Sequence, residues 1–272
     1  MSTQTGVFGW SAIVRLGLVQ ACLGAMVVLA TSTLNRIMVV ELALPALVPG
    51  LLVGFHYAIQ MVRPRMGFGA DRGRRCTPWM IGGVVTLALG GTLAAWGTIR
   101  MADTYWSGLL VCLLAFGLIG LGVSATGTSL LALMSKRVPE AMRAPAATTV
   151  WVMMIMGFAI TAGTVGKLID PYSPQRLLDV TAGLGVFIVV LTVLSLWRLE
   201  SATEPQGAAE EAGKMRSMRD FRQALATVWQ DPQARLFTLF VFLSMLAYSS
   251  QDLVLEPFAG AIFGMSPGET TQ

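Results

Sequence analysis

Long apolar segments constrain this chain more than any other feature of its sequence. Each can supply about 20 helical residues, the length that crosses a hydrocarbon core of about 30 Å. They fall at about 16–40, 45–62, 78–98, 106–133, 146–167, 179–198 and 234–256. Charged residues make up only 12% of the chain, about half the share of a soluble domain. A water-soluble fold is therefore excluded, and an all-α membrane protein with seven spans is expected.

The basic residues lie mainly on one side of these spans. Of the 19 Lys and Arg residues, fifteen lie at one set of span ends and only three at the opposite set. Because cytoplasmic loops carry the excess of Lys and Arg, the N-terminus is predicted to be cytoplasmic. The same distribution explains the net charge of +4, so a nucleic-acid partner is not expected.

Residues 199–233 form the one long polar stretch between spans. Its second part has apolar residues at helical spacing, such as Met215, Met218 and Phe221, with basic residues between them. This pattern predicts a basic amphipathic helix on the cytoplasmic lipid surface, or a simple tether between two bundles. The chain is thus divided into a six-helix bundle (1–198), a cytoplasmic linker (199–233) and the start of an incomplete second bundle (234–272). An odd number of spans favours a truncated chain.

The loop after the second span, residues 67–75, reads GFGADRGRR. It resembles the loop G-x-x-x-D-[RK]-x-G-[RK]-[RK] of the major facilitator superfamily. The match here is shortened by one residue between Asp71 and Gly73. The matching residues are Gly67, Asp71, Arg72, Gly73, Arg74 and Arg75. The resemblance implies a major-facilitator-like helix bundle, present here as its N-terminal half plus a seventh span. It also implies tight turns at the glycines and a charge-pair latch at Asp71; the alternative is an ordinary basic turn.

Five further stretches, 31–42, 55–57, 63–67, 75–79 and 251–258, are similar to the PucC/LhaA-type bacteriochlorophyll delivery family. One subgroup of this family is named as a chain of bacteriochlorophyll synthase. The resemblance implies an assembly factor for light-harvesting complexes that holds or hands over bacteriochlorophyll or a precursor. It places the chain in the bacterial inner (intracytoplasmic) membrane, with light-harvesting polypeptides or pigment-synthesis proteins as partners.

The single histidine of the chain, His56, lies about midway along the second span. A neutral imidazole is a good ligand for the magnesium of a chlorin and can also bond its other polar groups. The alternative is a structural histidine that is bonded across two helices. In the light of the family resemblance, we expect His56 to ligate or hydrogen-bond pigment.

Four further charges map to the outer end of the spans: Arg36, Glu41, Asp252 and Glu256. Arg36 and Glu41 are five residues apart, a separation at which two side chains of an α-helix do not face each other well. Each is therefore expected to pair elsewhere, in a network with Asp252 and Glu256 that contributes to the pigment or substrate site. The alternative is a set of interfacial anchors.

Glycines recur along the fourth span at Gly117, Gly120, Gly122 and Gly127. Small residues let neighbouring helices approach closely, so tight helix packing is favoured over a groove for a flat macrocycle.

Two other functions stay open: a secondary transporter of a small apolar or amphipathic solute, and a scaffold that binds light-harvesting subunits without pigment. Many proton-coupled relatives in the major facilitator superfamily carry an arginine four residues before a Gly-x-Gly in the fourth helix. Phe116 occupies that place here, which counts against proton-coupled transport. No catalytic or metal-binding grouping of His, Cys, Asp and Glu is evident in the sequence, so an enzyme is not expected.

Overall fold

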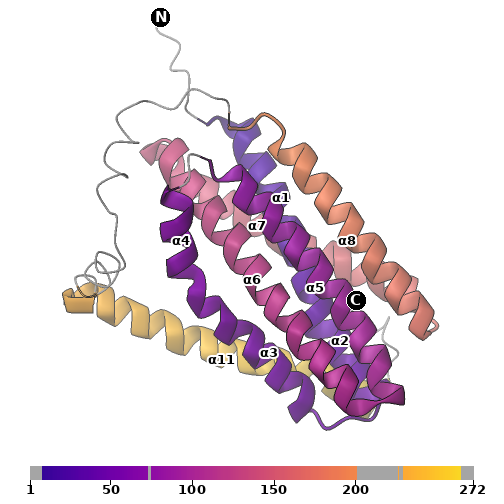
Figure 1. Cartoon of the computed structure of the whole chain (residues 1–272). Helices are drawn as coiled ribbons and strands as arrows, with labels where there is room; N and C mark the ends of the chain where they lie inside the picture. Colours follow the sequence, from indigo (N-terminus) through magenta and orange to yellow (C-terminus); the bar gives the residue numbers. More distant parts are fainter. Residues whose placement is uncertain (1–7, 73–74, 201–225, 227–228, 265–272) are drawn as a thin grey trace, which may run out of the picture.

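The computed structural model describes residues 8–72, 75–200, 226 and 229–264. Every regular element within these ranges is helical, and together they make seven rods that follow the seven apolar segments (Figure 1). The uninterrupted rods are α5 (Thr77–Asp103), α6 (Tyr105–Arg137), α7 (Glu140–Ile169), α8 (Pro174–Leu196) and α11 (Pro232–Phe263). The predicted all-α membrane fold is confirmed, and the chain is a multi-pass membrane protein.

The first two rods are interrupted. The first consists of α1 (Trp10–Val28), the π-helical turn η1 (Leu29–Thr33), α2 (Leu34–Arg36) and a second π-helical turn, η2 (Ile37–Glu41). The second consists of α3 (Leu47–Ile59), the 3₁₀ turn η3 (Gln60–Val62) and α4 (Arg63–Arg72). Both interruptions lie beside residues predicted to be functional.

Within the part of the chain that the structure describes, five rods are long and apolar enough to cross a membrane: Trp10–Glu41, α5, α6, α7 and α8. The second and seventh predicted spans coincide with helices whose apolar part is shorter. In α3 it covers 13 residues, about 20 Å of helix, and the polar side chains of Gln60 and Arg63 follow it. In α11 the apolar part is Pro232–Tyr248.

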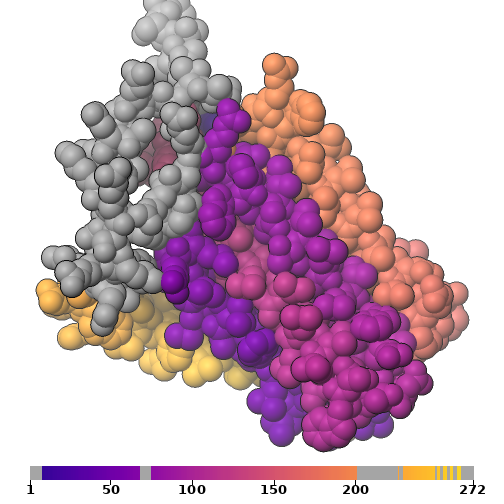
Figure 2. Space-filling view, in the orientation of Figure 1, coloured from indigo at the N-terminus to yellow at the C-terminus, as the bar shows by residue number. Residues whose placement is uncertain are grey.

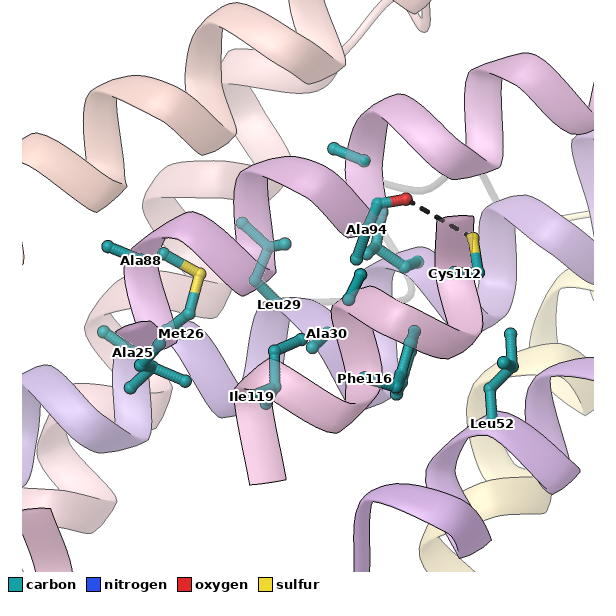
Figure 3. Packing of buried hydrophobic residues seen from close by; sticks show 14 of the residues in the cluster. Ala25, Met26, Leu29, Ala30, Leu52, Ala88, Ala94, Cys112, Phe116 and Ile119 are labelled. Carbon is teal, nitrogen blue, oxygen red and sulfur yellow. Dashed lines mark hydrogen bonds between the residues drawn. The ribbon is translucent and has the colours of Figure 1, made fainter. Parts of the chain in front are cut away.

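The antiparallel pair α5–α6 forms the centre of the bundle (Figure 1). Helix α8 packs against α5, α1 packs between α7 and α8, and α3 and α4 pack against α6. The largest apolar cluster joins α1, α3, α5, α6, α7 and α8 through fully buried side chains such as Met26, Leu29 and Ile119 (Figure 3). Phe116 is part of this cluster, so the position that carries an arginine in many transporters is occupied by a packed aromatic ring.

Glycines let α5 and α6 approach closely. On α5 they recur every seven residues, at Gly83, Gly90 and Gly97. A methyl group added to Gly122 of α6 would lie 2.6 Å from the carbonyl oxygen of Gly83. Seven-residue spacing keeps such positions in the seam of a left-handed helix pair, and small residues there allow backbone contact. The predicted packing role of Gly120 and Gly122 is confirmed, whereas a methyl at Gly127 would meet only one atom, at 4.0 Å.

Helix α11 crosses the lower end of the bundle obliquely in Figure 1 and contacts η1, α2 and η2. It begins at Pro232 behind Asp231, whose side chain accepts a hydrogen bond of 2.9 Å from the backbone N–H of Gln233. Figure 2 shows α11 along the lower edge of the molecule, where large apolar side chains such as Phe237 and Phe240 are exposed. The predicted amphipathic helix of the linker lies outside the described residues.

Candidate functional site

Arg36 and Glu41 form an ion pair, so the expectation that each pairs elsewhere was wrong for this contact. Nη1 of Arg36 lies 3.0 Å from Oε1 of Glu41. The reason is the π-helical turn between them. Its hydrogen bonds join residues five apart, as in Leu42 N–H to Ile37 O at 3.1 Å, and this wider turn brings residues i and i+5 to one face.

The local sequence accounts for the distorted helix. In η1, the Thr31 hydroxyl donates to the carbonyl of Val27 at 2.9 Å, a bond that competes with regular helix hydrogen bonding and bends helices. After η2, Ala43 adopts a φ of +50° and the rod ends. Arg36 is thereby held in the protein interior, with only 2% of its side chain exposed, whereas 29% of Glu41 is exposed.

Tyr172 is a neighbour of this ion pair that the sequence did not single out. It lies in the segment between α7 and α8 and packs against the main apolar cluster. Burial raises the pKa of its phenol, and the negative charge of Glu41 raises it further. The Glu41 carboxylate therefore pairs with Arg36 and lies close enough to Tyr172 for its charge to act on the phenol.

The proposed network with Asp252 and Glu256 stays a prediction. Both residues belong to α11, which contacts the η1–α2–η2 segment that holds Arg36. Their side chains lie outside the described part of the chain. The structure therefore brings the two helices together and leaves the four-charge network untested.

His56 is buried, with 1% of its surface exposed. Its Nε2 lies 2.7 Å from Nε2 of Gln60, one helical turn further along the chain. The side chain of Arg63 donates a hydrogen bond to Oε1 of the same Gln60 amide. The three residues form a relay along one side of the second rod, from its charged end to its apolar part. Within the described ranges, Nδ1 of His56 has no hydrogen-bond partner.

Pro64 explains why this relay sits at a change of helix type. A proline has no N–H and its ring crowds the carbonyl of residue i−4, here Gln60. The helix tightens instead, and the Arg63 N–H bonds to Gln60 O in a 3₁₀ turn. The spacing of His56, Gln60 and Arg63 at i, i+4 and i+7 is a sequence signal for one helix face. The prediction of His56 rested on its place in the second span, and Gln60 and Arg63 were not predicted with it.

The relay faces a close helix contact. A methyl group on Gly120 of α6 would lie 2.8 Å from the backbone oxygen of His56. At Gly117, one turn earlier, the nearest atom is a ring carbon of Phe55 at 3.5 Å. Gly120 thus fixes the distance between α3 and α6 at the level of His56.

The basic loop motif is partly helical. Gly67 lies inside α4, where a methyl group would be 2.9 Å from Cγ2 of Thr128, so it permits close α4–α6 packing and the tight turn expected there was wrong. Asp71 and Arg72 end α4, and their side chains are not described; Gly73 and Arg74 lie outside the described residues. Arg75 is exposed. The charge-pair latch at Asp71 stays a prediction.

Two other side chains hold this end of the bundle, and the sequence did not predict them. The Glu200 carboxylate accepts backbone hydrogen bonds from Cys76 at 3.0 Å and Thr77 at 2.7 Å, which caps the N-terminus of α5. Arg15 donates to the carbonyl of Ser195 at 2.7 Å and to that of Trp197 at the C-terminal end of α8. Neither contact has a signal in local spacing, because each joins distant parts of the chain.

An open apolar groove of about 380 Å³ lies between α4, α5 and α6. It is lined by Met66, Pro78, Trp79, Gly82, Gly83, Thr86, Leu121 and Ala125. Among the predicted site residues whose side chains the structure describes, none lines it. Within the searched residues, no group of three or more His, Cys, Asp or Glu side chains is placed to hold a metal ion.

Comparisons with known proteins give consistent results. The family model described as PUCC protein matches residues 33–272. The chain is 48% identical, over 97% of its length, to the bacteriochlorophyll synthase 44.5 kDa chain of Rhodobacter capsulatus. It is 27% identical over 96% of its length to the PucC proteins of Rhodovulum sulfidophilum and Rhodobacter capsulatus. It spans 60%, 60% and 59% of the lengths of these three relatives, respectively.

Proposed function

Because the chain belongs to the PUCC protein family, we propose that it is a membrane assembly factor for bacterial light-harvesting complexes. In this role it holds a bacteriochlorophyll-type pigment, or a precursor, and passes it on. The pigment is cargo, and the chain does not alter it chemically. The partners are light-harvesting polypeptides or pigment-synthesis proteins, and the site is the bacterial inner (intracytoplasmic) membrane with the N-terminus cytoplasmic.

The observation that carries this proposal is the 48% identity to a protein named as a chain of bacteriochlorophyll synthase, over 97% of this chain. The similarity includes the rods that hold His56 and Arg36 and extends through α11. The chain spans 60% of that relative's length, so the activity of the whole protein is part of the proposal.

The residues of the second rod fit an apolar macrocycle with polar groups at its edge. His56 presents a buried ring nitrogen without a partner among the described residues, on the helix face that also carries Leu52 and Val53. A polar group in an apolar interior is costly when it is unpaired. A pigment that contacts the apolar side chains and pairs this nitrogen would remove that cost.

The test is to purify the chain in detergent from a host that makes bacteriochlorophyll and to record its absorption spectrum. We expect a near-infrared pigment band at constant stoichiometry to protein across a size-exclusion peak. The matched control is an unrelated multi-pass protein purified from the same membranes, which reports pigment carried over by detergent micelles. Extracted pigment should be chemically identical before and after incubation, since no reaction is proposed.

A protein peak with no more pigment than the control would reject the carrier function. The remaining role would then be a scaffold for light-harvesting subunits, detected by co-purification of those subunits without pigment. Conversion of the pigment during incubation would reject the non-enzymatic part of the proposal.

A further inference from the structure

We propose that His56 carries its proton on Nδ1 and donates it to a carbonyl oxygen of the bound pigment, so that it recognises the edge of the macrocycle and not its central magnesium. This inference rests on the proposed function and assigns one atom of the chain to one chemical group of the ligand. Bacteriochlorophyll carries ketone and ester carbonyls at its periphery, which are hydrogen-bond acceptors.

The direction of the relay sets the position of the proton. An arginine side chain has donors only, so Arg63 fixes the amide of Gln60 with Oε1 toward the guanidinium. The amide nitrogen, which also only donates, then faces Nε2 of His56 at 2.7 Å. Nε2 must therefore be the acceptor. A neutral imidazole whose Nε2 accepts a hydrogen bond holds its proton on Nδ1.

The other protonation states conflict with this geometry. A ring protonated on Nε2, or on both nitrogens, would point an N–H at the N–H of Gln60. With the proton on Nδ1, neither nitrogen offers a lone pair to magnesium: Nε2 is engaged by Gln60 and Nδ1 is protonated. The Nδ1 hydrogen has no acceptor among the described residues, and a ligand carbonyl supplies one.

The ligand reaches Nδ1 only when α3 shifts relative to α6, because the ring is buried. The 3₁₀ turn Gln60–Val62 directly follows the site, and such a turn within a helix is a common place for bending.

The experiment compares two probes, bacteriochlorophyll a and its metal-free analogue bacteriopheophytin a, titrated into the detergent-purified chain. The two share their peripheral carbonyls and differ in magnesium. We expect His56→Ala to weaken the binding of both by the same factor, about threefold to tenfold for one lost hydrogen bond. His56→Asn, whose side-chain amide N–H lies close to the position of Nδ1, should restore most of the affinity for both.

Gln60→Leu tests the positioning role of the relay. Without Gln60, the imidazole proton of His56 can move from Nδ1 to Nε2. Nδ1 of His56 then offers a lone pair that can bind magnesium. We expect bacteriopheophytin to bind more weakly to this variant while bacteriochlorophyll keeps its affinity through magnesium ligation. In resonance Raman spectra, a carbonyl stretch lowered in the wild-type complex should return to the frequency of free bacteriopheophytin in this variant.

Four outcomes would overturn the inference. Loss of bacteriochlorophyll binding alone in His56→Ala would make His56 a magnesium ligand and leave the proposed function intact. Unchanged binding of both probes, or an equal loss that Asn does not restore and that leaves the carbonyl stretch unshifted, would assign His56 to packing. Failure of the wild-type chain to bind either probe would reject the proposed function together with the inference.

Discussion

The seam between α5 and α6 predicts a sharp difference between two glycines of the same helix. In Gly122→Ala, the added methyl group would lie 2.6 Å from Gly83 O and 2.7 Å from Leu87 N. Both are backbone atoms, so no side chain can move aside. Restoring the ordinary contact distance of 3.4 Å requires the two helices to separate by roughly 0.8 Å, and overpacking of this kind costs about 1–3 kcal/mol.

A second term follows from the same displacement. The Thr126 hydroxyl donates to the Met80 carbonyl across the seam at 3.1 Å, and a separation of that size breaks the bond, at a cost of about 1 kcal/mol. Alanine returns up to about 1 kcal/mol through its higher helix propensity. The net loss for Gly122→Ala is therefore about 1–3 kcal/mol, or roughly 2–10 °C in Tm.

The assay is thermal unfolding in detergent with a thiol-reactive fluorescent dye. It suits this chain because Cys22, Cys76 and Cys112 are all buried and become reactive only on unfolding. Gly127→Ala on the same helix is the matched control, since its methyl group would meet one side-chain atom at 4.0 Å. We expect its Tm to equal or exceed that of the wild type. Equal Tm values for the two variants would refute the reasoning from backbone contact.

Three other predictions concern the ends of the bundle. Glu200→Ala removes the cap of α5 and should lower the free energy of unfolding by about 1–2 kcal/mol, which a lower Tm would report. Glu200→Gln should lower the free energy of unfolding by a smaller amount. Equal Tm values for the wild type and Glu200→Ala would contradict a capping role for Glu200. Arg36→Met and Glu41→Gln should be less than additive in a double-mutant cycle, with a coupling above about 0.5 kcal/mol; full additivity would mean that the ion pair does not contribute. The raised pKa of Tyr172 favours the protonated phenol in the folded state, so the free energy of unfolding should fall as the pH rises above 10.0, the ordinary pKa of tyrosine. Tyr172→Phe should flatten the dependence of Tm on pH in this range. An unchanged slope in this variant would contradict the prediction.

Local pattern was sufficient to predict the helices. Apolar length located seven rods, although the start of α11 at Pro232, behind the capping side chain of Asp231, was placed two residues late. The same reasoning treated the second span as one regular helix and did not predict the 3₁₀ turn at its end. It left out the effect of Pro64 on the carbonyl of Gln60. Helix type is decided by such local hydrogen-bond balance, which hydropathy does not measure.

The candidate site was predicted less completely. His56 and Arg36 stood out as polar residues in apolar segments, and both are buried. The pairing of Arg36 with Glu41 was missed because side-chain facing was judged on α-helical geometry. Glu200 was missed for a different reason: it caps a helix that begins more than a hundred residues earlier, and no local spacing records such a contact.

The π-helical turn between Arg36 and Glu41 has a consequence for chain register. An α-helical turn also pairs residues four apart, so the ion pair by itself needs one residue fewer than the chain provides. The additional residue in this π-helical turn acts like a one-residue insertion that the helix absorbs without forming a loop. It rotates the residues that follow the turn by about 100° around the helix axis. Deleting one residue from Ile37–Val40 would keep the two charges in reach of each other and turn the end of the rod to a different side of the bundle.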